Sequence, residues 1–235
     1  MTPNPTQANV FAAIGNFLTA VLPPGTGVYK SQVNRVPEPV GSDFVMMTPL
    51  SQTRLETNVD TYTDTVFTAS IAGTVMTVSS VASGTIAIGA QVFGTGLVSG
   101  SLTITAFISG SGGPGTYSIS NSQTVSSQLM AAGLKALLQP TEWRIQLDVH
   151  GPNSADNAVV ISTAYRDEFG VNNFISSGFD VAPLYADDPR QMVFENDASQ
   201  MEDRWIVEAC LQCNSYISVS QQFASILALN LVEVI

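Results

Sequence analysis

The chain has 235 residues and carries 19 acidic residues against 8 lysines and arginines, which gives a formal net charge of −11. Proteins that bind nucleic acid through its phosphates need the opposite sign of charge, so this class is excluded. No apolar run approaches the roughly 20 residues that span a bilayer, and the start of the chain lacks the basic residues of a signal peptide, so we expect a soluble intracellular product.

Near the start of the chain, apolar residues recur at helical spacing between a candidate N-cap at Thr6 and a stop at Pro23 and Pro24. The apolar positions are Val10, Phe11, Ile14, Phe17, Leu18 and Val21. The pattern predicts an amphipathic helix of about four turns. Such a helix either packs on the sheet of its own chain or docks on a neighbouring subunit, and the sequence leaves both open.

Residues 28–39 have no periodic pattern and contain prolines, so we expect an irregular segment there. Two strands are predicted next, over residues 43–50 and 53–67. From Leu55 to Tyr62 the residue types alternate, which is typical of a sheet with one wetter face.

The most unusual stretch runs from Thr65 to Leu134 and contains no Asp, Glu, Lys, Arg or His, although it carries 11 of the 18 glycines. Globular proteins average about 25% charged residues, so this change of composition indicates a separate folding unit. Both flanks are charged and strand-like, which indicates that the unit is inserted into a host domain that resumes after it. We therefore predict a host domain of residues 1–64 and 135–235 and an inserted domain of residues 65–134.

Inside the uncharged stretch, short runs rich in Val, Ile, Thr and Phe recur at intervals of about ten residues, separated by glycine-containing turns. This spacing predicts a small all-β domain, either a sandwich or a barrel. Without ionisable groups the stretch supplies no acid, base or metal site, so its function would depend on shape, apolar contact or hydroxyl groups. The Gly-rich segment 110–115 lacks the lysine and the following helix of a phosphate-binding loop, so we expect a turn.

Residues 141–151 alternate strictly between apolar and polar types and predict a strand with two different faces. The apolar face would hold Trp143, Ile145, Leu147 and Val149, and the polar face Arg144, Gln146, Asp148 and His150. His150 beside Asp148 offers the base and the orienting group of a catalytic site, but no nucleophile motif accompanies them. We therefore expect no enzyme activity, no cofactor, and no catalytic or metal-binding residue.

A helix is predicted over residues 154–169, capped by Asn153 or the serine after it and stopped by Gly170. This places Asp167 and Glu168 in the last turn, where carboxylates oppose the helix dipole. Two explanations stay open for these two acids: they face a basic partner, or they are solvated.

Eight acids and only two bases occupy the segment from Asp180 to Glu208. The acids are Asp180, Asp187, Asp188, Glu195, Asp197, Glu202, Asp203 and Glu208. None of the fixed spacings of a calcium-binding loop is present, so we expect a solvated or interface surface in place of a metal site. The first seven of these acids, together with Asp167 and Glu168, are the candidates for a subunit interface or a channel wall.

Cys210 and Cys213 lie in a segment that predicts a strand, on which a separation of three residues points the two side chains to opposite faces. This favours a structural role for both thiols, and we expect them to be neither bridged nor metal-bound. The strand includes Trp205. We expect the chain to continue with a short helical turn over 220–227 and an apolar strand over 229–235, which must be covered by its own sheet or by another chain.

Three segments, residues 37–62, 139–158 and 218–235, resemble the neck or tail terminator proteins of tailed bacteriophages. The resemblance covers essentially all of the chain outside the uncharged stretch. It implies an α+β fold, a small mixed or antiparallel sheet with flanking helices, here carrying an inserted all-β, sandwich-like domain. It also implies a structural virion protein, assembled in the host cytoplasm into a ring, usually a hexamer. The ring would terminate the tail, join it to the head connector and leave a channel for DNA.

The partners that this resemblance implies are further copies of the chain, the tail tube protein and the head-completion or connector protein, with the tail sheath as a further candidate. DNA would only transit the channel, and no membrane is involved. The uncharged stretch resembles a Gly/Thr-rich β-module found in various phage structural proteins. This leaves a second function open, a virion decoration or binding module that recognises a host glycan or another coat protein. The aromatic residues of the stretch, which either stack on a sugar or belong to the core, are Phe67, Phe93, Phe107 and Tyr117.

Overall fold

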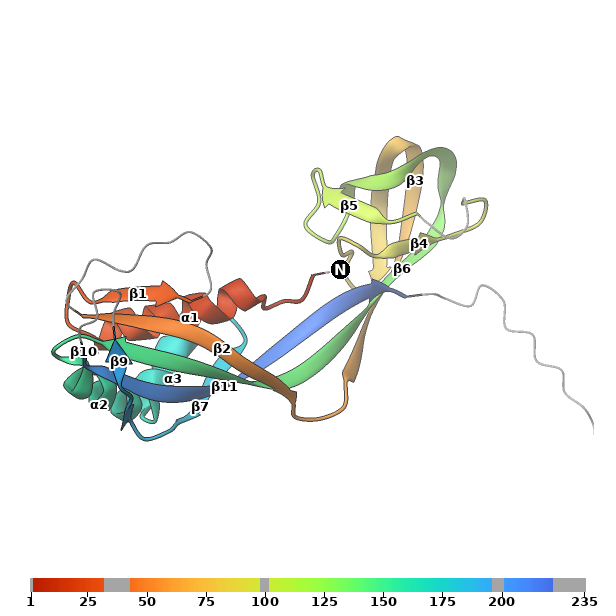
Figure 1. Cartoon of the computed structure of the whole chain (residues 1–235). Helices are drawn as coiled ribbons and strands as arrows, with labels where there is room; N and C mark the ends of the chain where they lie inside the picture. Colours follow the sequence, from red (N-terminus) through yellow and green to blue (C-terminus); the bar gives the residue numbers. More distant parts are fainter. Residues whose placement is uncertain (1, 32–42, 98–101, 196–200, 222–235) are drawn as a thin grey trace, which may run out of the picture. The chain divides into compact units, whose positions relative to one another are not determined.

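The computed structural model describes residues 2–31, 43–97, 102–195 and 201–221 (Figure 1). The chain divides into two compact units, which we call the α/β unit and the β-unit. Among the described residues, the α/β unit consists of Thr2–Val59 and Leu138–Tyr216, and the β-unit of Asp60–Leu137 with residues 217–221.

The α/β unit is built on a mixed sheet with the strand order β1-β2-β6-β11-β7. These strands are Gly27–Lys30 (β1), Phe44–Arg54 (β2), Gly115–His150 (β6), Val181–Ala186 (β7) and Arg204–Ser220 (β11). β1 runs parallel to β2, whereas β2 is antiparallel to β6 and β7 is antiparallel to β11. Of three further short strands, Arg190–Gln191 (β8) pairs with β11, and Phe194–Glu195 (β9) pairs with Met201–Glu202 (β10). Together with the helices described next, this confirms the α+β class and the mixed sheet.

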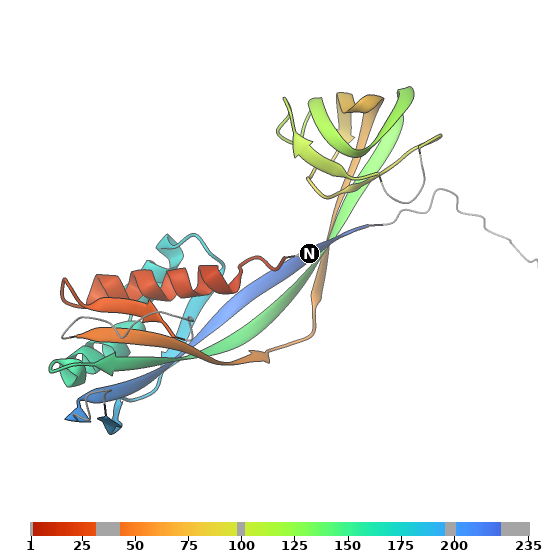
Figure 2. The same cartoon turned by 45° about the horizontal axis from the view of Figure 1, so that its top comes forward.

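The first helix, α1 (Gln7–Val21), forms as the sequence predicts. Thr6 caps it, because the Thr6 hydroxyl accepts a hydrogen bond from the Asn9 N–H at 3.3 Å while the Asn9 side chain accepts one from the Thr6 N–H at 2.9 Å. Its buried face joins the core of its own unit through Val10, Phe11, Ala13, Ile14, Phe17 and Leu18. Figure 2 shows α1 lying alongside the strands of the sheet, so of the two alternatives left open, the helix packs on its own chain.

The prediction of one helix over residues 154–169 is wrong, because the chain forms two helices there, α2 (Ser154–Tyr165) and α3 (Glu168–Ser176). Asp167 is the N-cap of α3, and its carboxylate accepts a hydrogen bond from the Phe169 N–H at 3.1 Å. Glu168 follows in the first turn. Both acids therefore lie at the positive end of a helix dipole, where negative charge is stabilised. The prediction that they lie in the last turn of a helix is wrong.

Gly170 also has a different role from the predicted helix stop. It is buried within α3, where the helix closely approaches the end of α2. A Cβ atom at this position would lie 2.7 Å from the carbonyl oxygen of Ala164 and 3.0 Å from that of Tyr165. The glycine is therefore needed for close packing between the two helices.

The alternation predicted for residues 141–151 is confirmed along β6. Its apolar residues join the core of the α/β unit, where they meet residues of all three described helices. The sheet residues of this core are Val45, Met47, Trp143, Ile145, Leu147, Val149, Val181, Ala186, Val207, Ala209, Leu211 and Cys213. The alternate residues of the same strands point the other way, because successive side chains of a strand face opposite sides. We call this second side the open face; it includes Phe44, Met46, Arg144, Gln146, Asp148, His150, Arg204, Ile206, Glu208 and Cys210.

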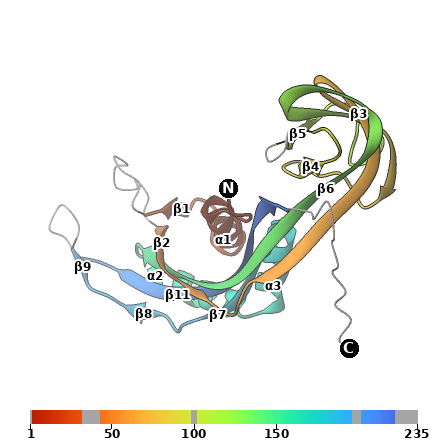
Figure 3. The ribbon, with the colours of Figure 1, turned by 90° about the vertical axis from the view of Figure 1, so that its right-hand side faces the viewer.

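The β-unit has a core of its own, and every member of that core lies between Phe67 and Ala132, inside the uncharged stretch. Its strands are Val59–Ser83 (β3), Gln91–Phe93 (β4), Ile104–Phe107 (β5) and the first part of β6. β3, β4 and β5 all pair with β6, and in Figure 3 β3 and β6 curl around the two short strands. Gly84 is essential to this arrangement, since its φ is +73° and a Cβ atom there would collide with the backbone of Asp64.

Three expectations about strands are corrected. Residues 28–39 are not wholly irregular, because Gly27–Lys30 forms β1. The strand predicted over 53–67 is interrupted between β2 and β3, and every residue from Leu50 to Asp64 is exposed, so the alternation there does not mark a buried face. The short, regularly spaced strands predicted for the uncharged stretch are in part segments of two long strands, because β3 has 25 residues and β6 has 36.

The helical turn predicted over 220–227 begins with Ser220, which is instead the last residue of β11, and from Gln222 it lies outside the described residues. The strand predicted over 229–235 also lies outside them. The strand predicted through Trp205 is confirmed as β11. None of the described helices is long and apolar enough to cross a membrane.

Candidate interaction surface

The most organised polar feature of the α/β unit is an ion pair on the open face between neighbouring strands β6 and β11. The Arg204 Nε donates to Asp148 Oδ1 at 2.9 Å, and Gln146 Nε2 donates to both Asp148 oxygens at 2.8 and 2.9 Å. The Asp148 side chain is only 7% exposed. A buried carboxylate is tolerated only when it is paired and hydrogen-bonded, and these donors meet that requirement.

A second group of charges lies on the same face around Arg144 and Glu208. Arg144 contacts Glu142 at 3.1 Å and Glu208 at 4.0 Å, and it donates to the Tyr185 hydroxyl at 2.6 Å. Arg190 reaches Glu208 at 2.5 Å. Glu208 therefore connects two arginines, and these side chains form a network that links β6, β7, β8 and β11.

His150 does not form a catalytic pair with Asp148. Its ring stacks on Phe44 with centroids 4.5 Å apart, and the ring of Phe194 meets it edge-on at 4.9 Å. Its Nδ1 makes no hydrogen bond within the described residues, and Asp148 is held by Arg204 and Gln146 instead. Burial lowers the pKa of His150, and the Arg204 guanidinium lowers it further, against the opposing charges of Asp148 and Glu202. The imidazole of His150 is therefore a packed aromatic group of the sheet.

Among the described residues, the acids proposed from the sequence as interface or channel residues have different environments. Asp167 caps α3, Asp180 accepts a hydrogen bond from Asn214 Nδ2 at 2.9 Å, and Asp188 pairs with Arg166 at 3.1 Å although its side chain is 91% exposed. Within the described residues, no group of three or more His, Cys, Asp and Glu side chains could hold a metal ion.

The remaining candidates are spread along the segment that joins β7 to β11. Glu195 and Glu202 belong to the paired strands β9 and β10, and Asp203 lies next to β11, 3.5 Å from the Gln191 side chain. The Asp187 N–H donates to the Glu208 carbonyl at 2.8 Å. Glu168 is exposed at the start of α3. Asp197 lies outside the described residues.

Cys210 and Cys213 lie on β11 as predicted, and both are buried free thiols. Cys213 belongs to the helix-covered core, whereas Cys210 is on the open face, so the two side chains lie on opposite sides of the sheet. Burial raises the pKa of both thiols. A raised pKa reduces the thiolate fraction and with it the reactivity, as expected for structural cysteines.

The four aromatic residues of the uncharged stretch have different environments. Phe67 and Tyr117 are fully buried in the core of the β-unit. Phe93 is partly buried, and Phe107 is 41% exposed while its ring packs edge-on against Tyr117. Phe107 is therefore the most accessible of the four rings.

The partners within the open face are not evident from the sequence. Alternation places Arg144 and Asp148 on a polar strand face, but it does not connect them to Arg204 and Glu208, because strand neighbours are not visible in one sequence. The available signal was the set of polar residues at alternate positions from Glu142 to Asp148, together with the two charged residues Arg204 and Glu208 on one face of the later strand.

Comparison with known proteins gives one family. The sequence model of the phage neck terminator protein family matches residues 103–235. This range includes β5, the whole of β6, helices α2 and α3, and β7 to β11. No curated protein matches the chain. The Asp148–Arg204 ion pair, the two helices before β7 and the acidic segment all lie within the matched range, and the chain belongs to the phage neck terminator protein family, whose members are structural proteins of the virion neck.

Proposed function

We propose that this neck protein forms a ring that closes the end of the tail, joins the tail to the head connector and surrounds a channel for DNA. The proposed contacts are with further copies of the chain, as a hexamer, with the tail tube protein and with the head-completion protein. The tail sheath is a further candidate partner. The ring would be assembled in the host cytoplasm without enzyme activity.

The proposal of a DNA channel is supported by the contacts that the lysine and arginine side chains make. Each lysine and arginine among the described residues contacts a partner within the chain: Lys30, Arg54, Lys135, Arg144, Arg166, Arg190 and Arg204. With 19 acids against 8 bases in the sequence, the surface has few cations available for phosphates. DNA would pass such a channel wall more easily, because each contact between a cation and a phosphate would slow the DNA and make its passage salt-dependent.

The observation that supports assembly is the number of large apolar side chains left at the surface of the α/β unit. The most exposed are Leu50, Leu55, Val159, Phe169, Ile175, Met192, Val193 and Met201. Exposed apolar area of this kind is typical of surfaces that contact another protein. Ile175 is 69% exposed and Val193 is 81% exposed, so neither contributes much to the fold of its own chain.

We further infer that the acidic residues from Asp180 to Glu208 face either the channel or a boundary between subunits. Changing Asp187 and Asp188 to lysine distinguishes a channel wall from a subunit boundary. At a channel wall, the change should preserve the ring and slow DNA ejection at low salt, because the new cations hold phosphates. At a subunit boundary, the same change should weaken the ring itself, because it removes one member of each charge pair.

A double variant that assembles and ejects DNA like the parent at every ionic strength would show that these acids are only solvated. Because Asp188 pairs with Arg166, the single variant Asp187→Lys is the control that leaves this pair intact.

The second candidate function is a binding module for a host glycan or another coat protein, carried by the β-unit. Exposed Phe107 favours it, since sugar sites use a stacking ring. Phe107→Ala should then abolish retention on a host glycan array, while Phe93→Ala should reduce it less. If the unmodified protein is not retained on the array, the glycan-binding function is ruled out.

Electron microscopy of the purified protein tests the proposed ring. Rings with a central hole support the terminator function. A dispersed monomer at concentrations of tens of micromolar, about the range where protein assemblies of μM affinity form, would contradict it.

A further inference from the structure

The single histidine of the chain, His150, is packed against two aromatic rings on the open face. Phe44 of β2 lies opposite His150 of β6 in the strand register, and the two rings stack with centroids 4.5 Å apart. The ring of Phe194, from β9, meets His150 edge-on with centroids 4.9 Å apart. His150 is only 5% exposed, and Phe194 forms part of its cover.

Phe194 belongs to a short hairpin that the paired strands β9 and β10 form. Other large apolar side chains of this region contribute little packing, since Val193 is 81% exposed and Met201 is 73% exposed. Phe194 is partly buried, and its ring contacts His150 and lies 5.7 Å from the guanidinium of Arg204. The packing of the hairpin on the open face therefore depends on Phe194.

Two backbone hydrogen bonds join the base of this hairpin to the sheet. The Met192 N–H, just before β9, donates to the Arg204 carbonyl at 2.9 Å. The Gly151 N–H, next to His150, donates to the carbonyl of Asp203 at 3.1 Å. These two bonds open when the hairpin leaves the face, so their amides report its position.

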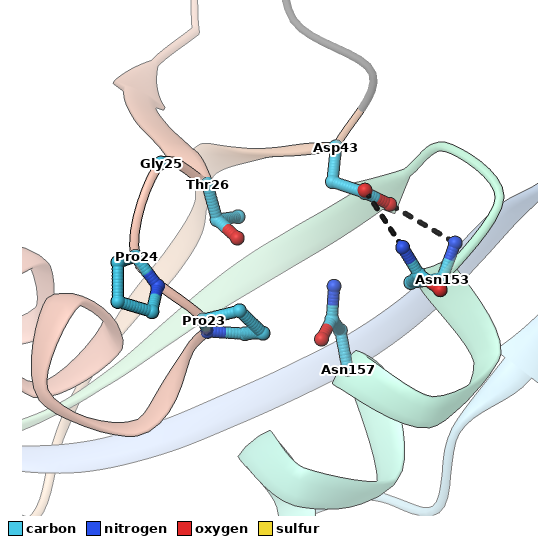
Figure 4. Close-up of a pocket in the computed structure, with 7 residues that line it drawn as sticks. All are labelled: Pro23, Pro24, Gly25, Thr26, Asp43, Asn153 and Asn157. Atoms are coloured by element: carbon cyan, nitrogen blue, oxygen red, sulfur yellow. Dashed lines mark hydrogen bonds between the residues drawn. The ribbon is translucent and has the colours of Figure 1, made fainter.

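The buried ring nitrogen Nδ1 of His150 has no hydrogen-bond partner within the described residues. A neutral imidazole has one N–H donor, whereas the protonated ring has donors on both nitrogens. Protonation would therefore leave a buried, charged donor without an acceptor, which is costly. The carboxylate of Asp43, the residue before Phe44, is engaged elsewhere. Figure 4 shows it turned to Asn153, whose N–H and Nδ2 donate to it at 3.0 and 2.9 Å.

The charges that face His150 come from three strands. Burial lowers the pKa of His150, and the Arg204 guanidinium of β11 lowers it further. Asp148 of β6 and Glu202 of β10 act in the opposite direction, but they do not reverse the shift. The two aromatic rings carry no charge, although the face of a ring attracts a cation. The packed arrangement therefore favours the neutral imidazole.

We propose that protonation of His150 detaches the β9–β10 hairpin from the open face by displacing the ring of Phe194. Detachment lets water accept a hydrogen bond from the imidazolium and removes the ring that covers it. The open form then binds the proton more tightly than the closed form, so the population shifts toward the open form as the pH falls below about 6.5. This switch goes beyond the proposed ring and does not depend on it, because all of its groups lie within one α/β unit.

Hydrogen exchange of the Met192 and Gly151 amides in the full-length protein measures the position of the hairpin. After correction for intrinsic exchange, their protection should fall several-fold between about pH 7.5 and 5.5. The fall is at most about tenfold, because one proton is bound by a group whose pKa in the open form is about 6.5. The control is the Asp187 N–H, which donates to the Glu208 carbonyl at 2.8 Å further along β11. Its protection should change less than about twofold.

Variants test the roles of the two rings. His150→Phe keeps a ring at this position without a titratable group, so the Met192 amide should stay protected at both pH values. Phe194→Ala removes the attachment of the hairpin and should lower this protection about tenfold or more at about pH 7.5. Val193→Ala truncates the neighbouring side chain, which is 81% exposed, and should change the protection less than about twofold.

The unmodified protein provides a second measurement that does not require any variant to fold. Because the chain has one histidine, the imidazole C–H resonances in nuclear magnetic resonance spectra belong to His150, and their titration midpoint should lie below about pH 6.5. A midpoint at or above this value would overturn the proposal, as would protection of Met192 that does not change with pH. An equal loss at the Asp187 amide would show that the whole unit opens, and a His150→Phe variant with the parent's pH dependence would show that another group titrates. Either result would also overturn the proposal.

Discussion

The two units of this chain differ in the kind of polar group that they bury. The β-unit has its core inside a stretch without Asp, Glu, Lys, Arg or His, and the polar side chains of that stretch are hydroxyls and amides, as where Thr65 Oγ1 donates to the Thr85 carbonyl at 2.6 Å. The α/β unit instead buries a carboxylate, Asp148, under an arginine and an amide. The charges of the β-unit lie outside its core, as in the half-exposed pair of Lys135 with Asp60 at 2.6 Å, whereas the α/β unit has a charge within its sheet.

The sharpest way to separate the two units is to open a cavity in each core. Phe17 is fully buried in the α/β unit, 5.3 Å from Tyr165 between ring centroids, and Phe67 is fully buried in the β-unit. Phe17→Ala and Phe67→Ala should each cost about 3 to 5 kcal/mol. Calorimetry should show two transitions, with each variant lowering only one of them. A single transition that both variants lower equally would mean that the units unfold together.

The buried ion pair offers a second comparison, now within the α/β unit. Asp148→Asn should destabilise this unit by about 2 to 3 kcal/mol, because it leaves the Arg204 charge partly buried without its carboxylate. Asp188→Asn is the matched control, because Asp188 also pairs with an arginine but is 91% exposed, and it should cost less than about 0.5 kcal/mol. Urea unfolding measures both. Similar costs for the two would contradict the role assigned to burial.

The corrected position of Asp167 predicts a smaller effect. Asp167→Ala removes the N-cap of α3 and should cost about 1 kcal/mol, measured by urea unfolding. Glu168→Gln, which keeps the shape of the side chain and loses only the dipole interaction, should cost a few tenths of a kcal/mol. If Asp167→Ala were instead stabilising, the acid would lie at the unfavourable end of a helix, as the sequence pattern alone predicts.

The smallest expected effect is a pH dependence carried by His150. Its pKa in the folded protein is lowered from 6.5 by burial, so the unfolded chain binds the proton more readily. The free energy of unfolding should therefore be unaffected by His150 above about pH 6.5. It should decrease as the pH falls below that value through the pKa of His150 in the folded protein. His150→Gln should remove this loss between pH 7 and 5 in thermal unfolding curves, whereas a variant with an unchanged pH profile would show that other groups cause it.

The sequence predicted the elements whose signals are local. α1 follows from its apolar spacing, the cap at Thr6 and the prolines after it, and β6 follows from strict alternation. The break between α2 and α3 was missed, because Asp167 fits both a last turn and an N-cap, and Gly170 fits both a stop and a close contact. Arg204, the charged partner of Asp148, is 56 residues away in sequence, and no local pattern reveals this pair.

We propose that assembly resides in the α/β unit and that residues 65–134 are an insertion that the ring does not need. The family match supports the first part only for residues 103–235, which includes the end of the uncharged stretch. A variant in which a short Gly/Ser linker replaces residues 65–134 separates the two parts of the chain. Its circular dichroism spectrum should retain the helical signal of α1, α2 and α3.

Sedimentation velocity of this linker variant beside the full-length chain is the most direct measurement. The account predicts that both proteins form the same number of copies per ring, with the variant smaller only by the mass removed from each copy. A folded variant that sediments as a monomer while the full-length chain forms rings would contradict it, because assembly would then require the β-unit. An insoluble variant would contradict the insertion itself.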